Sequence, residues 1–164
     1  MRHVDFNNRI AIYAGSFDPP TYGHLNIIKR ISQLFDKIII AVATNKKKKY
    51  LFNIKERLNL IHLCCLQLTN IEIHVCDKAL VDFALNKKAK ILIRSLRNIS
   101  DFTYELQMAT INKKLSQQLE TFFLASDTDC SYISSSMVKE LLFLDQDISK
   151  FIPNEILDIV INKK

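Results

Sequence analysis

The amino-acid sequence predicts an α/β protein built on a doubly wound, five-stranded parallel sheet with helices on both faces. Two observations lead to this prediction. Short apolar segments of strand length alternate with helical patterns along the chain, which is the order expected of parallel strands joined by right-handed crossovers. One of these segments, KIIIAVAT at residues 37–44, has an unbroken apolar centre, as expected for a strand covered on both faces.

Length and composition are consistent with one domain, which we expect to span residues 1–164. Hydrophobic residues make up 48% of the chain and charged residues 24%, a balance typical of a globular protein with a buried core. Glycine and proline are scarce, so long flexible linkers are not expected. The two glycines, Gly15 and Gly23, both lie in one short segment near the N-terminus.

The predicted strands are short segments rich in Ile, Val, Leu or Phe. The first, RIAIY, ends at the turn signal Ala14-Gly15. The expected strands are residues 9–13, 37–44, 70–75, 90–94 and 121–124.

The predicted helices show apolar residues at helical spacing and recognisable capping residues. Thr21 can cap the first helix, and Asn53 followed by Glu56 matches a capping box. The expected helices are residues 22–35, a helix that starts after Asn53, and residues 79–86, 99–115, 134–144 and 154–161.

Polar and charged segments follow several of the predicted strands. In a Rossmann-like sheet, ligands bind outside the carboxyl ends of the strands. The segments at these ends are residues 15–24, 45–50, 94–97 and 126–136. We therefore expect four distant parts of the chain to meet at one edge of the sheet.

The overall charge limits the classes of partner. The chain has 23 basic and 17 acidic residues, a net charge of +6, which suits phosphorylated ligands. A small nucleic-acid-binding protein is an alternative, but the aromatic residues are not interleaved with basic ones as a stacking platform requires, so we expect no nucleic acid. No apolar run approaches the ~18 residues that span a bilayer, so we expect no membrane partner.

Cysteine usage points to a reducing compartment. The four cysteines show no zinc-ligand spacing, and because the N-terminal residues MRHVDFNNR are polar we expect no signal peptide. We expect free thiols and a cytoplasmic location.

The segment GSFDPPTYGH at residues 15–24 has the chemistry of an anion site. Gly15 allows a phosphate to approach the backbone closely, and Ser16 offers a hydroxyl and an N–H. His24 falls in the first turn of a helix, where the helix dipole favours anions. The segment is neither a Walker A loop nor G-x-G-x-x-G, and it resembles the signature G-[ST]-F-D-x-x-x-x-G-H of the nucleotidylyltransferase superfamily.

Three further segments narrow this resemblance to one family. Residues 93–97 read IRSLR and are followed by DFTYE at 101–105, and residues 132–136 read YISSS. Over almost its whole length the chain resembles the phosphopantetheine adenylyltransferases. This implies a Rossmann-like fold and transfer of AMP from ATP to 4'-phosphopantetheine, giving dephospho-CoA and pyrophosphate. The alternatives are a nucleotidylyltransferase for another phosphorylated acceptor and a non-catalytic nucleotide-binding module.

The resemblance implies catalytic roles for three residues. His24 would bind ATP phosphate oxygens and stabilise the transition state, and Arg97 would bind the β and γ phosphates. Lys48 would neutralise the reacting phosphates, although it is one of four consecutive lysines at residues 46–49, any of which could be the active one. A phosphate dianion is already a nucleophile, so no general base is required.

The resemblance also implies which residues contact each of the two substrates. Ser16, Lys48, Leu80 and Arg94 would bind phosphopantetheine, with Arg94 at its phosphate and Leu80 at its pantetheine arm. The expected ATP contacts are Ser16, Phe17, His24, Ser95, Leu96, Arg97, Glu105, Cys130, Ser131, Tyr132, Ile133, Ser134, Ser135 and Ser136.

Other expectations concern metal, assembly and regulation. Mg²⁺ would accompany ATP, with no metal site built by protein side chains, because the sequence shows no carboxylate cluster. The resemblance implies a homohexamer and feedback by CoA. Ser95 stands where the family usually has glycine; a positive φ there would strain serine, and its side chain could crowd the nucleotide.

Overall fold

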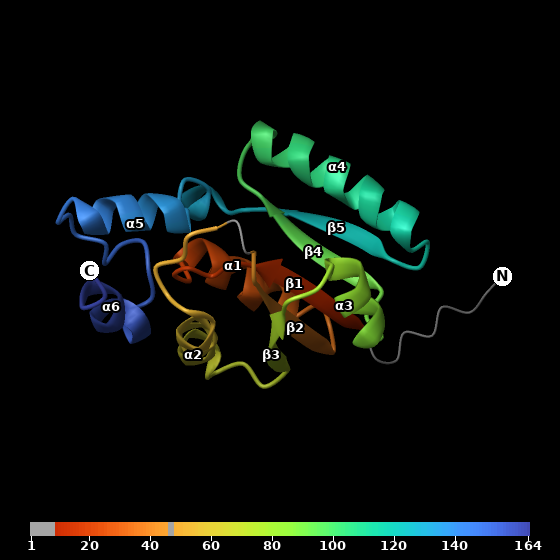
Figure 1. The fold of residues 1–164 in the computed structure, drawn as a ribbon, viewed down its shortest axis with the longest axis horizontal. Coiled ribbons are helices and arrows are strands. Elements are labelled where there is room, and N and C mark those ends of the chain that lie inside the picture. Colours follow the sequence, from red (N-terminus) through yellow and green to blue (C-terminus); the bar gives the residue numbers. More distant parts are fainter. Residues whose placement is uncertain (1–8, 46–47) are drawn as a thin grey trace.

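One parallel sheet organises the computed structural model, which describes residues 9–45 and 48–164. Within these residues the strands lie in the order β3-β2-β1-β4-β5 (Figure 1). Their bounds are β1 (Ile10–Gly15), β2 (Lys37–Ala43), β3 (Ile71–Cys76), β4 (Ile91–Leu96) and β5 (Glu120–Ala125). The first strand is central, with β2 and β4 paired on its two sides, so the chain winds outward in both directions. This is the predicted doubly wound sheet.

Helices cover both faces of the sheet. The helices are α1 (Tyr22–Ser32), α2 (Ile54–Cys65), α3 (Leu80–Asn86), α4 (Ile99–Leu115), α5 (Ser135–Phe143) and α6 (Asn154–Ile161), with a short 3-10 helix η1 (Thr128–Cys130). Alternate residues of β2 point to opposite faces: Ile40 packs in the core with α1 and α2, and Ile39 packs in the core with α3. A strand buried on both faces needs this continuous apolar sequence.

The two predicted helix caps form as expected. Thr21 caps α1, and the side chain of Asn53 accepts a hydrogen bond from the N–H of Glu56 at 3.0 Å. Glu56 completes the capping box by accepting from the N–H of Asn53 at 2.8 Å. These caps fix where the chain enters each helix, immediately after the loops that reach the carboxyl edge of the sheet.

A separate apolar cluster attaches the C-terminal helices. Phe52, before α2, packs with Val138 of α5 and Ile156 of α6, and Figure 1 shows α5 and α6 at the same end of the molecule. The cluster positions α5 so that its N-terminus lies at the carboxyl edge of the sheet.

The fourth helix is much less buried than the others. Helix α4 contacts β4 and β5 and lies over them in Figure 1, but it has no buried residue. Ile99 is 85% exposed and Tyr104 60% exposed. Exposed apolar side chains on a helix are typical of a surface that meets another protein.

Element boundaries differ from the prediction by a few residues. Strands β1 and β4 are longer than expected at their carboxyl ends, because Ala14 and Gly15 pair with Ala41 and Val42 of β2, and β4 pairs with β5 as far as Leu96. The first helix ends at Ser32 rather than residue 35, and the short helix η1 was not predicted. None of the helices in the described ranges combines the length and hydropathy of a bilayer-spanning segment.

Candidate active site

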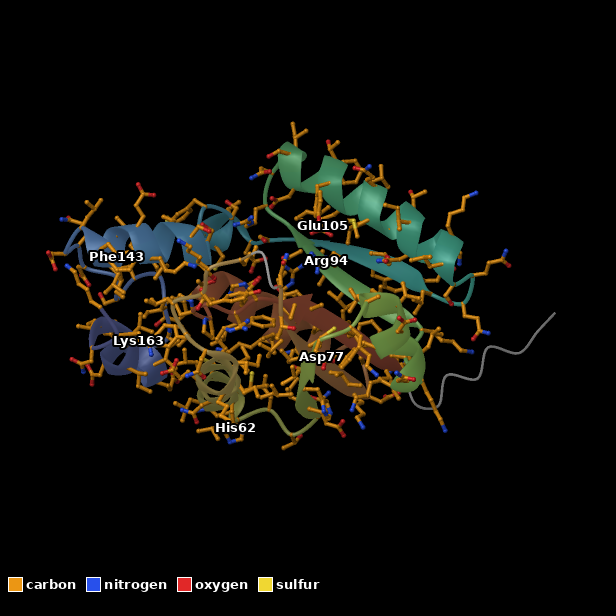
Figure 2. The ribbon with its side chains drawn as sticks, viewed as in Figure 1. His62, Asp77, Arg94, Glu105, Phe143 and Lys163 are labelled. Carbon is orange, nitrogen blue, oxygen red and sulfur yellow. The ribbon has the colours of Figure 1, made fainter. Side chains whose placement is uncertain are left out.

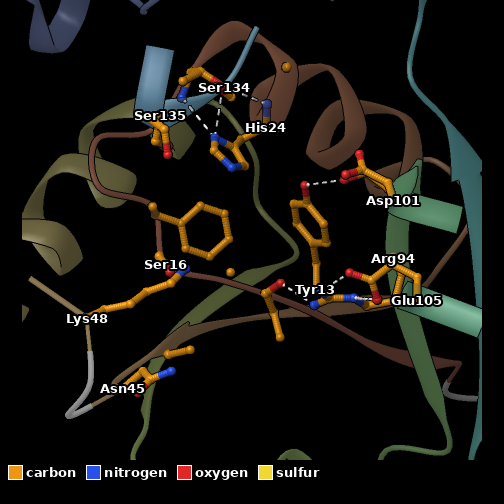
Figure 3. A pocket seen from close by; sticks show the side chains of 18 of the residues that line it. Tyr13, Ser16, His24, Asn45, Lys48, Arg94, Asp101, Glu105, Ser134 and Ser135 are labelled. Atoms are coloured by element: carbon orange, nitrogen blue, oxygen red, sulfur yellow. Dashed lines mark hydrogen bonds and ion pairs between the residues drawn. The ribbon is translucent and has the colours of Figure 1, made fainter. Parts of the chain in front are cut away.

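A cavity of about 480 Å³ opens at the carboxyl edge of the sheet. It lies where β1 and β4 are neighbours and the winding direction reverses, which is the ligand-binding position in doubly wound folds. All four predicted segments contribute lining residues. Figure 3 shows His24 with Ser134 and Ser135 on one side, Arg94 and Glu105 on another, and Ser16 with Lys48 on a third.

His24 is fixed in one tautomer by the capping box of α1. Its Nδ1 accepts a hydrogen bond from the backbone N–H of Thr21 at 3.0 Å, and a backbone N–H can only donate. The neutral ring therefore carries its hydrogen on Nε2. Burial, together with the nearby charge of Arg97, lowers the pKa of His24 to about 4. His24, which lines the cavity, is thus a neutral donor at physiological pH.

The ring of Phe17 packs against the ring of His24. The Phe17 ring is fully buried and meets the rings of His24 and Tyr13 edge-on, with centroids 5.0 and 5.7 Å away. A Cβ atom on Gly15 would lie 3.0 Å from the Phe17 ring, a tight contact that the ring could relieve only by shifting. Gly15 also lines the cavity, and the close approach of a phosphate to its backbone stays a prediction.

Arg94 and Glu105 form a two-pronged ion pair within the cavity. Nε and Nη2 of Arg94 donate to the two carboxylate oxygens of Glu105 at 2.7 and 2.5 Å, and Nη1 donates to the carbonyl of Ala14 at 2.8 Å. Figure 2 shows the two labelled side chains meeting between β4 and α4. The guanidinium retains N–H groups for a ligand, and its orientation is set by Glu105.

The charged residues of the cavity leave an excess of positive charge. Arg97 is held by Asp101, four residues later, with Nε and Oδ2 2.9 Å apart. Lys48 and Lys78 also line the cavity. With Arg94 and Glu105, the lining holds four basic and two acidic side chains, which favours a polyanionic ligand.

The three serines of the YISSS segment have different roles. The hydroxyl of Ser134 caps α5 by accepting from the N–H of Met137 at 3.1 Å. The hydroxyl of Ser135 donates to the carbonyl of Pro19 at 2.7 Å. The first-turn N–H groups of Ser135 and Ser136 lack intrahelical partners, and both residues line the cavity. This end of α5 therefore offers donors to an anion.

Asp18 ties three parts of the site together. Its carboxylate is 2% exposed and accepts from the N–H groups of Leu51 and Phe52 at 3.0 and 2.9 Å. Lys139 of α5 donates to the same carboxylate at 2.9 Å. The loop after β1, the end of the lysine loop and α5 are thus held by one side chain.

Ser95 lies at the end of β4 without backbone strain. Its φ is not in the positive range that strains serine, so the strain considered from the sequence does not arise. Its hydroxyl is 3.4 Å from the hydroxyl of Tyr13, whose pKa is raised by burial. The serine side chain is therefore directed at a protein group and also lines the cavity.

Most of the residues proposed from the sequence lie together. Those that line the cavity are Ser16, Phe17, His24, Lys48, Leu80, Arg94, Ser95, Arg97, Glu105, Ile133, Ser134, Ser135 and Ser136. Those that do not are Leu96, Cys130, Ser131 and Tyr132, and their roles stay predictions. Two of the four consecutive lysines, at residues 46 and 47, lie outside the described residues.

Sequence reasoning missed several lining residues. Tyr13, Thr21, Tyr50, Lys78 and Asp101 all face the cavity. Asp101 stands in the DFTYE segment that was noted, but nothing in the sequence indicated its pairing with an arginine. Lys78 follows β3, and its position at the carboxyl edge was the available signal.

The described residues contain no cluster of three or more His, Cys, Asp or Glu side chains that could bind a metal. The two carboxylates of the cavity, Asp101 and Glu105, are each paired with an arginine. The lining therefore does not fit a protein-built magnesium site, for which free carboxylate ligands are typical.

Comparison with known proteins identifies the class. Residues 12–141 match the model of the cytidylyltransferase-like family, so the chain belongs to that family. Two solved structures share the fold: a putative nicotinate-nucleotide adenylyltransferase from Vibrio parahaemolyticus, with a TM-score of 0.70 and 18% identity over 94% of this chain and 93% of that one, and the Plasmodium falciparum nicotinic acid mononucleotide adenylyltransferase complexed with NaAD, with a TM-score of 0.71 and 17% identity over 94% and 95%.

Curated relatives narrow the assignment. The phosphopantetheine adenylyltransferase of Clostridium novyi is 46% identical over 94% of this chain and 96% of its own length. That of Nautilia profundicola is 48% identical over 90% and 96%. Within the cytidylyltransferase-like family, the chain belongs to the phosphopantetheine adenylyltransferases.

Proposed function

We propose that the protein transfers the adenylyl group of ATP to 4'-phosphopantetheine, forming dephospho-CoA and releasing pyrophosphate. The observation that carries this proposal is the cationic cavity at the point where the winding of the sheet reverses, with His24 locked as a donor inside it. Both substrates and both products carry phosphate groups, which this lining suits. The names of the curated relatives support the choice of acceptor.

The chemistry needs positioning and charge stabilisation. The phosphate oxygen of phosphopantetheine attacks the α-phosphorus of ATP in line, the bond from that phosphorus to the bridging oxygen breaks, and pyrophosphate leaves. Nε2–H of His24 donates to the phosphate oxygens on which charge develops. Lys48 neutralises the reacting phosphates. The first-turn N–H groups of Ser135 and Ser136 donate hydrogen bonds to the leaving pyrophosphate.

The remaining side chains hold the two substrates. Arg94 binds the phosphate of phosphopantetheine in an orientation set by Glu105, and Leu80 contacts the pantetheine arm. Arg97 binds the β and γ phosphates of ATP. Glu105 was expected to bind the nucleotide; its pairing with Arg94 supports a positioning role in the same cavity.

Magnesium enters in this proposal as part of the substrate MgATP. Both carboxylates of the lining are occupied by arginines, so the ion is held by nucleotide phosphates and water. Mg²⁺ usually keeps several water ligands at such sites.

We further propose a cytoplasmic homohexamer that is inhibited by CoA. The four cysteines are free thiols, which suits a reducing compartment. Helix α4 exposes the apolar side chains of Ile99, Phe102, Tyr104 and Leu115, and exposed apolar side chains of this kind favour self-association. CoA contains the pantetheine arm and the adenine nucleotide of the product, so it suits the same cavity. A mass in solution near six times 19.0 kDa would support the hexamer, and a monomer would contradict it.

The function is tested by pyrophosphate release with MgATP and three acceptors. We expect release with 4'-phosphopantetheine and none with nicotinamide mononucleotide or glycerol 3-phosphate. Release with another acceptor alone would retain the reaction type and overturn the substrate. No release with any of the three would favour a non-catalytic nucleotide-binding module.

A further inference from the structure

Arg57 of α2 contacts residues from three segments that line the cavity. Its side chain is almost fully buried, with 2% of the residue exposed. Nη1 donates to the carbonyl oxygens of Ser16 at 2.7 Å and Ala43 at 2.9 Å, and the guanidinium lies 4.0 Å from the centre of the Tyr50 ring. Ser16, Ala43 and Tyr50 all line the cavity, and they come from the ends of β1 and β2 and from the loop that carries Lys48.

The charge of Arg57 has no counter-ion within the part of the chain that the structure describes. Its partners are two carbonyl dipoles and one aromatic ring, all of them neutral. Its Nε is buried without a hydrogen-bond partner. A buried cation without an opposite charge is costly. A bound anion on the other side of the Ser16 peptide would offset that cost.

The contact with Ser16 also sets the direction of a backbone donor. The carbonyl of Ser16 points at Arg57, and the only cis peptide in the described ranges is Asp18–Pro19. In a trans peptide the carbonyl and the following N–H point in opposite directions. The N–H of Phe17 therefore points away from Arg57, and it makes no backbone hydrogen bond with other described residues. Phe17, with φ at 50°, also lines the cavity.

We propose that Arg57 is a positioning residue for the phosphate of phosphopantetheine. It holds the Ser16–Phe17 peptide with its N–H directed at the bound phosphate, and it places a positive charge behind that peptide. Arg57 acts through the backbone and does not touch the substrate. The inference rests on the proposed function for the identity of the phosphate ester.

The test compares two ligands that differ only in the phosphate. Isothermal titration calorimetry with 4'-phosphopantetheine and with pantetheine is performed on the full-length parent, Arg57→Met and Arg57→Lys. Arg57→Met should bind phosphopantetheine at least about tenfold more weakly, because the Ser16–Phe17 peptide loses both the charge behind it and the hydrogen bond that orients it. It should bind pantetheine as the parent does. Arg57→Lys keeps the charge but not the guanidinium fork, so its loss should be intermediate and confined to the phosphorylated ligand.

The matched control is Arg9→Met, which removes a cation that pairs with Asp36 at the opposite end of β1. The affinities of this variant for both ligands should equal those of the parent.

Equal weakening of both ligands by Arg57→Met would mean that Arg57 only maintains the shape of the cavity, and unchanged affinity would remove it from phosphate binding. If Arg57→Met does not fold, Arg57→Lys decides: parental affinity for phosphopantetheine overturns the proposal. A parent that fails to bind phosphopantetheine counts against the proposed acceptor instead, and inorganic phosphate then serves as the probe, whose binding should still weaken in the Arg57 variants.

Discussion

Replacing His24 tests whether the cavity stabilises developing negative charge with a neutral donor. His24→Ala removes the Nε2–H that the Thr21 contact fixes toward the ligand side of the ring. Loss of one such donor in comparable sites lowers turnover by about 10²–10³-fold, or about 2.7–4 kcal/mol. Loss of the histidine half of the α1 capping box should cost only about 1 kcal/mol of stability. Turnover is measured by pyrophosphate release, and stability by thermal unfolding of the same preparations.

The pH dependence distinguishes a neutral from a charged histidine. Because burial lowers the pKa of His24 to about 4, the ring is already neutral well below its ordinary value of about 6.5. The profile of kcat/KM, which reports groups of the free enzyme, should therefore show no inflection from His24 near 6.5. The phosphate monoester of the substrate titrates at about 6, so His24→Gln is the control: an acid limb that persists in this variant belongs to the substrate.

Two outcomes would refute this reasoning. Turnover of His24→Ala within a few fold of the parent would remove His24 from transition-state stabilisation. An inflection near pH 6.5 that is present in the parent and absent from His24→Gln would mean that the imidazolium, rather than the neutral ring, is the active form.

Three further predictions concern other parts of the site. Lys48→Ala should lower turnover by at least about tenfold and Lys49→Ala should not; a reversed pattern in the pyrophosphate assay would shift the active lysine by one position. Arg94→Ala should raise the KM for phosphopantetheine more than that for ATP, by at least about tenfold, and a larger effect on ATP would assign it to the nucleotide. Asp18→Asn should destabilise the fold by about 2 kcal/mol in urea unfolding, because the amide nitrogen cannot accept from a backbone N–H as the carboxylate does and Lys139 loses its charged partner; a loss below about 1 kcal/mol would mean that these contacts contribute little.

The sheet and the general place of the site could be predicted because both follow from local patterns. Continuous apolar runs identified strands such as β2, and the alternation with helices implied parallel pairing. Because ligands bind at the carboxyl ends of strands in such sheets, Ser16, Lys48 and Arg94 were predicted to meet at one edge, and the cavity lies there. Each of these inferences needs only a short stretch of sequence and a general topology.

What could not be predicted depends on contacts between distant residues. Arg57 follows Lys55 and Glu56 in a helix, and nothing in this local sequence marks it as buried. Its burial follows from how α2 packs behind the loops after β1 and β2. The end of β1 was misplaced because Ala14 and Gly15 join the strand only through pairing with β2. The partner of Arg94 is a glutamate eleven residues later on another element, and no motif indicates which charged residues will pair.

The contact between Asp18 and Lys139 affects when, during translation, the site can be completed. During synthesis the chain emerges from its N-terminus, so β1, the centre of the finished sheet, is available before any of its neighbours. Its loop contains an acidic side chain whose ammonium partner, Lys139, lies 121 residues further along. A ribosome-bound chain that stops short of α5 therefore carries the loop after β1 without Lys139, the cation that pairs with Asp18. Catalytic competence should appear only near the end of translation, long after the sheet can begin to assemble.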